Sequence, residues 1–139
     1  MRIMAIDYGD AHTGIAISDP TGFLAGFTTT INAYRPEVVA EQIAALAKEH
    51  GVEELVLGHP INMDGTRGPR SEKAQAMKAL LEETTSLPVV LWDERRTTID
   101  AHQILMNSGK NAKKRKKVVD AVAASLILEG YLTYKKSHP

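Results

Sequence analysis

The chain has 139 residues, enough for one domain with its own core and too few for two full-sized domains. Hydrophobic residues make up 43% and charged residues 24%, which are ordinary values for a soluble globular protein. The absence of cysteine excludes disulfides, thiolate catalysis, iron–sulfur clusters and cysteine-based zinc sites. The formal net charge is zero, yet the segment from Lys110 to Lys117 holds six basic residues and no acid. The remainder then has 11 basic against 17 acidic residues, a net charge of −6. Such a basic run indicates either a polyanion partner or a solvated linker.

No segment approaches the roughly 18 apolar residues that a membrane-spanning helix needs. Asp7 interrupts the apolar N-terminal segment that a signal peptide would require. We therefore expect a cytoplasmic protein that forms a single domain over residues 1–139. Its five histidines share no spacing typical of metal ligands, so we do not expect a zinc site.

The first third of the chain predicts three short strands. Residues 2–8 form an apolar strand that ends in an acid, and residues 12–18 form a second strand after a turn at Gly9-Asp10. Asp19-Pro20-Thr21-Gly22 has the composition of a type I turn, and a third strand follows at residues 23–31. The short connections indicate an antiparallel meander.

Helices and strands then alternate. A helix begins at Pro36 and is closed by Gly51, and Leu55–Gly58 form a short buried strand. A second helix runs from near Pro69 to about Thr85, and a fifth strand spans Pro88–Trp92.

Two further helices complete the chain. The first begins at Thr97 or Thr98 and stops at Gly109. The last spans roughly residues 117–134 and is apolar almost all round from Val118 to Leu128, so it should be covered on most sides. This order predicts an α/β fold with a mixed sheet, helices on both faces and the first strand at its centre.

Acidic residues occur at two strand ends. Asp7 closes the first strand, and in an open sheet functional sites gather at the carboxyl ends of strands. It could instead initiate the turn that follows. Asp93 and Glu94 follow the fifth strand, where adjacent side chains face opposite ways, so one of the two is expected to reach a site. The alternative is a charged surface turn in which they pair with Arg95 and Arg96.

Asp120 is the one acid between Val118 and Leu128. Burying an unpaired carboxylate costs several kcal/mol, so we expect a compensating partner. Placement near a helix N-terminus is the alternative, and it contributes about 0.3–1 kcal/mol. Several carboxylates gathered without histidine or cysteine suit Mg²⁺ or Mn²⁺. Two such ions about 3.5–4 Å apart could drive phosphodiester cleavage.

Four segments of the chain resemble the YqgF/RuvX family. They are Asp7-Tyr8-Gly9 with Gly14-Ile15-Ala16-Ile17-Ser18-Asp19, Gly58-His59-Pro60-Ile61-Asn62-Met63-Asp64-Gly65-Thr66, Asp93-Glu94-Arg95-Arg96-Thr97-Thr98, and Lys114-Arg115-Lys116-Lys117-Val118-Val119-Asp120 with Ala123-Ala124. The resemblance implies a ribonuclease H-like fold with strand order 3-2-1-4-5. It also implies a metal-dependent nuclease for the 5′ end of pre-16S rRNA. An older description of the family is Holliday junction resolvase, by analogy with the RuvC resolvases.

The family's acidic positions fall on Asp7, the Asp93/Glu94 pair and Asp120. We expect Asp7, Glu94 and Asp120 to hold Mg²⁺ or Mn²⁺ and to be catalytic, with Asp93 as the alternative to Glu94, because the resolvase relatives use a glutamate. The residues expected to bind nucleic acid are Lys113, Lys114, Arg115, Lys116, Lys117, Arg95, His12, Asn62 and Asp64.

One departure from the family lies in the first turn. Relatives often carry a basic residue where this chain has Ala11, and His12 could take over its phosphate contact. Trp92 is a further candidate contact, because its ring could stack on a base. A tryptophan on a buried strand more commonly packs in the core. Tyr131 and Tyr134, at helical spacing, are also expected to pack.

Parts of the sequence also fit three other functions. An Asp-x-Gly hairpin also opens actin-like and sugar-kinase ATPases, but these need two such domains and the chain has no P-loop. A non-catalytic RNA-binding module is an alternative, although all candidate acids are present. A DNA junction nuclease is the other alternative, and such enzymes generally act as two-fold dimers.

Overall fold

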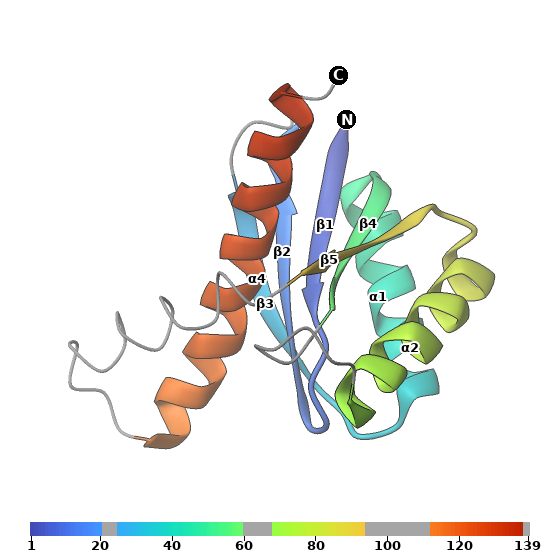
Figure 1. Ribbon diagram of the computed structural model, residues 1–139, viewed down its shortest axis with the longest axis vertical. Coiled ribbons are helices and arrows are strands. Elements are labelled where there is room, and N and C mark those ends of the chain that lie inside the picture. The colour runs from blue at the N-terminus through green and yellow to red at the C-terminus, as the bar shows by residue number, and fades with distance from the viewer. Residues whose placement is uncertain (21–24, 60–67, 94–111, 138–139) are drawn as a thin grey trace.

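The computed structural model describes residues 1–20, 25–59, 68–93 and 112–137, and for residues 25 and 112–120 it describes the backbone alone (Figure 1). Within these ranges the elements are β1 (Arg2–Asp7), β2 (His12–Ser18), β3 (Ala25–Asn32), α1 (Pro36–His50), β4 (Val52–His59), α2 (Pro69–Thr85), β5 (Val89–Asp93) and α4 (Ala112–Ser137). The predicted helix at residues 97–109 lies outside the described residues.

The five strands form one mixed sheet in the order β3-β2-β1-β4-β5. β1 pairs antiparallel with β2 and parallel with β4, while β2 pairs antiparallel with β3 and β4 parallel with β5. The predicted strand order, the antiparallel meander and the central position of the first strand are confirmed. Because β1, β4 and β5 are parallel, their carboxyl ends meet at one edge of the sheet.

Helices cover both faces of this sheet, α1 and α2 on one side and α4 on the other (Figure 1). Alternation along β1 explains the two layers, since Met4 and Ile6 belong to the core under α1 and α2, whereas Ile3 and Ala5 belong to the core under α4. Strands buried on both faces read as continuous apolar runs, as the sequence of β1 does.

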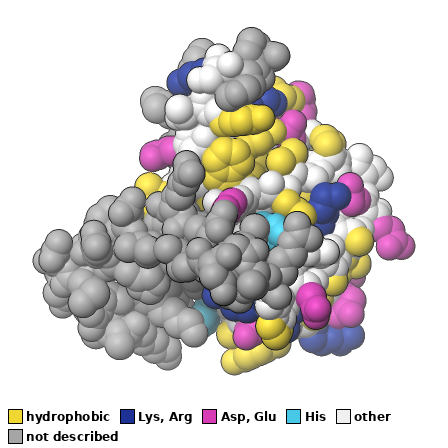
Figure 2. All heavy atoms as spheres, in the orientation of Figure 1, with side chains coloured by type: hydrophobic (Ala, Val, Ile, Leu, Met, Phe, Trp, Pro, Cys, Tyr) yellow, Lys and Arg dark blue, Asp and Glu magenta, His cyan; other side chains and the backbone are white. Residues whose placement is uncertain are grey.

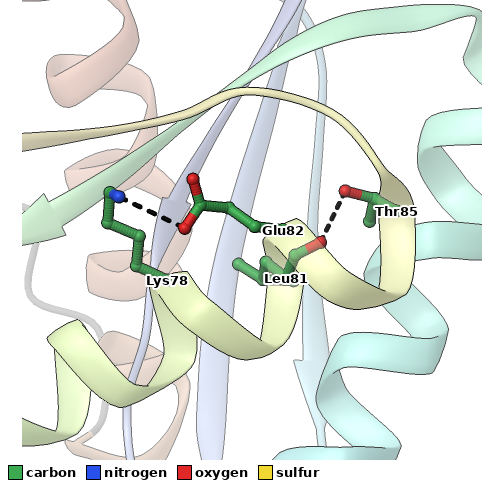
Figure 3. Close-up of polar contacts among 4 residues, drawn as sticks. All are labelled: Lys78, Leu81, Glu82 and Thr85. Atoms are coloured by element: carbon green, nitrogen blue, oxygen red, sulfur yellow. Dashed lines mark hydrogen bonds and ion pairs between the residues drawn. The ribbon is translucent and has the colours of Figure 1, made fainter.

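Helix ends follow the predicted signals. Pro36 occupies the first turn of α1, and Gly51 ends the helix in the left-handed conformation with φ of 67°. The last turns of α2 are held by local side-chain contacts, in which Thr85 Oγ1 donates to the Leu81 carbonyl at 2.6 Å and Lys78 pairs with Glu82 at 3.2 Å (Figure 3). Each of these helices buries one face, as the spacing of their apolar residues predicts.

Two elements begin at least three residues before their predicted starts. β4 begins at Val52 rather than at residue 55, because its first residues pair with the start of β1, where Arg2 lies opposite Val52. α4 begins at Ala112 rather than near residue 117. Lysine and arginine are good helix formers, so the basic residues 113–117 belong to the helix instead of forming a linker before it.

Aromatic residues join the end of α4 to the sheet. Trp92 of β5 meets the rings of Tyr131 and Tyr134 edge-on, with centroids 5.6 and 5.7 Å apart. Tyr131 also donates from its hydroxyl to Glu54 Oε1 at 2.5 Å. The structure thus places all three rings in packing roles, and apolar side chains gather over this half of α4 in Figure 2. In the described part of the chain, no helix is long and apolar enough to cross a membrane.

Candidate functional site

Asp7 is the last residue of the central strand, at the edge where the parallel strands end. Alternation places it on the face covered by α4, together with Ile3 and Ala5. Its partner across the β1–β2 ladder is Gly14, a buried residue that has no side chain. The Asp7 side chain is half-buried, and no hydrogen bond or ion pair joins it to another described residue.

The N-terminal end of α4 lies at the same end of the molecule as the end of β1, because α4 runs from there towards the two chain termini (Figure 1). Asp120 belongs to this half of α4 and comes one turn before Ala123 and Ala124, both of which are buried against the sheet. The backbone thus carries the half of α4 that contains Asp120 to the end of the molecule where β1 ends, and contact between Asp7 and Asp120 stays a prediction. The side chain of Asp120 lies outside the described residues.

Asp93 lies on the other face of the sheet from Asp7. In β5, Val90 and Trp92 pack under α4, whereas Val89 and Leu91 pack under α1 and α2. Asp93 comes two residues after Leu91, so its side chain faces the same side of the sheet as Leu91. In the ladder it lies beside His59 of β4. The next residue, Glu94, is outside the described residues.

A buried polar pair that sequence reasoning missed lies under this edge. His59, 7% exposed, bonds through Nε2 to Oγ of the fully buried Ser71 in the first turn of α2, at 2.6 Å. Together they join the two ends of the segment from residue 60 to residue 68. A signal for Ser71 was present, since it shares the helical spacing of the buried residues Ala74 and Met77.

Gly9 forms the tightest point of the β1–β2 turn. A Cβ built on it would lie 2.4 Å from the carbonyl oxygen of His12, closer than real Cβ atoms approach backbone. This turn carries the chain away from Asp7, so its shape sets the surroundings of that carboxylate. The glycine is therefore required for a close backbone approach.

We expect Gly9→Ala to lower the free energy of unfolding by about 1–3 kcal/mol, because the turn must shift to admit the methyl group. Gly130→Ala is the matched control, since its Cβ would meet Trp92 at an ordinary 3.5 Å in the interior of α4. That control should be neutral or stabilising by up to about 1 kcal/mol. Urea unfolding of the two variants measures both effects, and equal stability of both would contradict the role given to Gly9.

A cavity of about 410 Å³ opens on the other side of the same turn, between it and the start of α2. It is lined by Tyr8, Gly9, Asp10, Ala11, His12, Arg70 and Lys73. Lys73 pairs with Asp10 at 3.0 Å, and His12 Nδ1 lies 2.6 Å from Asn32 Oδ1. Burial raises the pKa of Tyr8 above its ordinary value, partly opposed by Lys73, so its phenol stays protonated at neutral pH.

Several predicted site residues cannot be placed beside Asp7. Glu94, Arg95, Asn62 and Asp64 lie outside the described residues, and the five basic residues of 113–117 are described in their helical backbone alone. Among the side chains that the structure does describe, no group of three or more histidines and acids could hold a metal ion. The predicted metal site thus remains a prediction that depends on Glu94 and Asp120.

Comparison with known sequences identifies relatives along the whole chain. Residues 1–134 match the family described as "RuvX: Holliday junction resolvase". A protein of Halothermothrix orenii named "Putative pre-16S rRNA nuclease" is 45% identical over 97% of this chain and 96% of its own length. A protein of Chloroflexus aurantiacus with the same name is 43% identical over 99% of this chain and 90% of its own.

Comparison with solved structures shows the same fold at low sequence identity. Thermus thermophilus RuvC in complex with a Holliday junction substrate superposes with a TM-score of 0.65 at 13% identity, covering 99% of this chain and 96% of that one. Fowlpox virus resolvase with its junction DNA gives a TM-score of 0.56 at 11% identity and covers 99% of each chain. The ribonuclease H-like fold expected from the sequence is therefore confirmed.

Proposed function

Because this chain belongs to the RuvX (YqgF) family, we propose that it is a metal-dependent nuclease that hydrolyses phosphodiester bonds at the 5′ end of pre-16S rRNA. The observation that carries the proposal is Asp7, a carboxylate at the carboxyl end of the central strand without a partner among the described residues. Relatives at 42–45% identity bear the corresponding rRNA nuclease name. Such a role would place the protein in the cytoplasm.

The residues proposed as ligands fit Mg²⁺ or Mn²⁺. A half-buried carboxylate that has no partner among the described residues suits a hard cation, which prefers oxygen ligands. Asp7 from β1, Glu94 after β5 and Asp120 from α4 would supply such oxygens from three elements. When bound, the metal would activate a water molecule and neutralise the charge on the phosphate.

Glu94, rather than Asp93, is our proposed third ligand. Alternation along β5 places Asp93 on the face of the sheet that α1 and α2 cover, whereas Asp7 lies on the face that α4 covers. The position of Asp93 thus speaks against it as a ligand beside Asp7 and leaves Glu94 as the proposed acid of the pair. Comparing cleavage by Asp93→Asn and Glu94→Gln tests this choice, and the larger loss should fall on Glu94→Gln.

The basic residues from Lys113 to Lys117 are proposed to hold the phosphates next to the cut. They occupy the first turns of α4, at the end of the molecule where β1 ends (Figure 1). Cations at a helix N-terminus are disfavoured by the helix dipole, and the first turn of α4 contains no acid to offset them. A bound polyanion would relieve this repulsion, which supports a nucleic-acid partner over a solvated linker.

A Holliday junction nuclease is the second candidate, favoured by the description of the family. We test both with a labelled pre-16S leader and a labelled four-way DNA junction, each incubated with Mn²⁺, with Mg²⁺ and with EDTA. Metal-dependent cutting of the leader is the expected result. Symmetric cutting of the junction in its place would support the resolvase, and tight binding without any cutting would indicate a non-catalytic binding module.

A further inference from the structure

Two adjoining cavities lie beside the β1–β2 turn, on the side of α1 and α2. The first is the 410 Å³ cavity with Arg70, Lys73 and His12 in its wall. The second, about 430 Å³, reaches past Tyr34 and Leu80. Tyr8, Asp10 and Lys73 line both, so the Lys73–Asp10 ion pair stands at their junction.

The two cavities differ in chemistry. The first gathers the cationic side chains of Arg70 and Lys73 with the imidazole of His12, whose orientation is held by Asn32. Arg70 and Lys73 belong to the first turns of α2, where the helix dipole also favours an anion. Two carboxylates are already present there, that of Glu72 in the first turn of α2 and that of Asp10, whose side chain pairs with Lys73 and is 82% exposed. An ion pair so exposed contributes little to stability and exchanges readily.

The second cavity presents an aromatic surface. Tyr34 is 79% exposed in the connection between β3 and α1, and the half-buried Tyr8 lies in the same wall. The backbone under these residues is tied together, because the Ala33 amide donates to the Ala11 carbonyl at 3.2 Å. Exposed aromatic rings beside a basic groove are the combination that binds single-stranded nucleic acid, through stacked bases and paired phosphates.

We propose that the two cavities together bind one unpaired nucleotide of the RNA strand, next to the bond that is cut. The phosphate lies against Arg70 and Lys73, replacing the carboxylate of Asp10, and the base stacks on Tyr34. The site begins at the residue after Asp7 but on the opposite face of the sheet, so it holds a flanking nucleotide rather than the reacting phosphate. This inference rests on the proposed nuclease function and adds its preference for a single-stranded flank.

Binding of three fluorescent RNA duplexes tests the site: a blunt duplex, one with an adenosine extension of about three nucleotides, and one with an abasic extension of equal length. EDTA is present to suspend cleavage. Tyr34→Ala should weaken binding of the adenosine extension about tenfold and leave the abasic extension unchanged, because one base stack is lost. Lys73→Gln should weaken both extended duplexes and reduce the salt slope of log K by about 0.7, the value for one single-strand phosphate.

Two further variants complete the test. Asp10→Asn should tighten binding of both extended duplexes by about threefold, because it removes the competing carboxylate. Lys78→Gln is the matched control, since Lys78 forms a similar lysine–carboxylate pair on the same helix, with Glu82, away from the cavities (Figure 3). It should leave all three affinities unchanged.

The outcomes separate this site from the nuclease activity. If wild-type protein cuts the rRNA leader but Tyr34→Ala and Lys73→Gln bind the extensions as wild type does, the nucleotide site is wrong and the nuclease stands. If the extensions bind through Tyr34 and Lys73 but nothing is cut, the nuclease is wrong and the site stands. An extension that adds no affinity to the blunt duplex overturns the site in either case.

Discussion

Asp7→Asn should reduce cleavage of a pre-16S leader by more than about 100-fold while RNA affinity stays within a few-fold of wild type. A residue that merely orients a metal ligand already contributes 10–100-fold, so the loss of a ligand should exceed that range. The amide keeps the shape of the side chain but removes the charge that a divalent cation requires. Single-turnover cleavage in Mn²⁺ and filter binding in EDTA measure the two quantities separately.

Glu49→Gln is the control for this substitution. Glu49 is an exposed carboxylate near the C-terminal end of α1, at the end of the sheet where β1 begins. At this position the same change from carboxylate to amide should leave the rate of leader cleavage unaltered. Full activity of Asp7→Asn would exclude this carboxylate as a metal ligand, and an equal loss of RNA binding would assign it to binding instead of chemistry.

A triple variant that reverses three charges of the basic run should weaken RNA binding roughly 100-fold at low salt. Its substitutions are Lys113→Glu, Lys114→Glu and Lys117→Glu. Each phosphate neutralised by a cation releases counterions, so the salt slope of log K should fall by about 2 to 3 as well. Fluorescence titrations at four salt concentrations give both numbers. The slope is the more telling of the two, because a general loss of stability would not alter it in this way.

The matched variant reverses three cations that lie elsewhere, Lys48 in α1, Lys78 in α2 and Lys136 at the end of α4. It changes the net charge by the same amount and should change the affinity far less. Equal effects of the two triple variants would mean that overall charge drives binding. A salt slope that the first variant leaves unchanged would remove the basic run from the RNA interface.

Most of the architecture could be predicted because it depends on local signals. The order of the described elements follows from the turn residues between β1, β2 and β3, the proline at the start of each of α1 and α2, and the glycine after α1. The start of α4 could not be predicted as well. The basic run resembles a linker in composition, while the intrinsic helix preference of lysine and arginine carries the helix back to Ala112.

The candidate site could be predicted in its chemistry and less in its geometry. Asp7 stood out because an acid ends an apolar strand, and Asp120 because it interrupts an apolar helix. The His59–Ser71 pair was missed, since helical spacing indicates that Ser71 is buried but no local pattern indicates that it will meet a histidine at the end of β4. Lys73 and Arg70 were missed for the same reason, as they come to the β1–β2 turn only after α2 packs over β4 and β5.

The sequence by itself determined the class of fold, the family and the set of acids and bases available for chemistry on a phosphodiester. These follow from periodicity, turn composition and motif, which are properties of neighbouring residues. The tertiary structure decided which of them share a face. It placed Asp7 under α4 and Asp93 on the opposite side, and it brought Tyr34, Lys73 and Asp10 together around one turn. Such contacts depend on the pairing register of strands and on the packing of helices distant in the sequence, which no local pattern specifies.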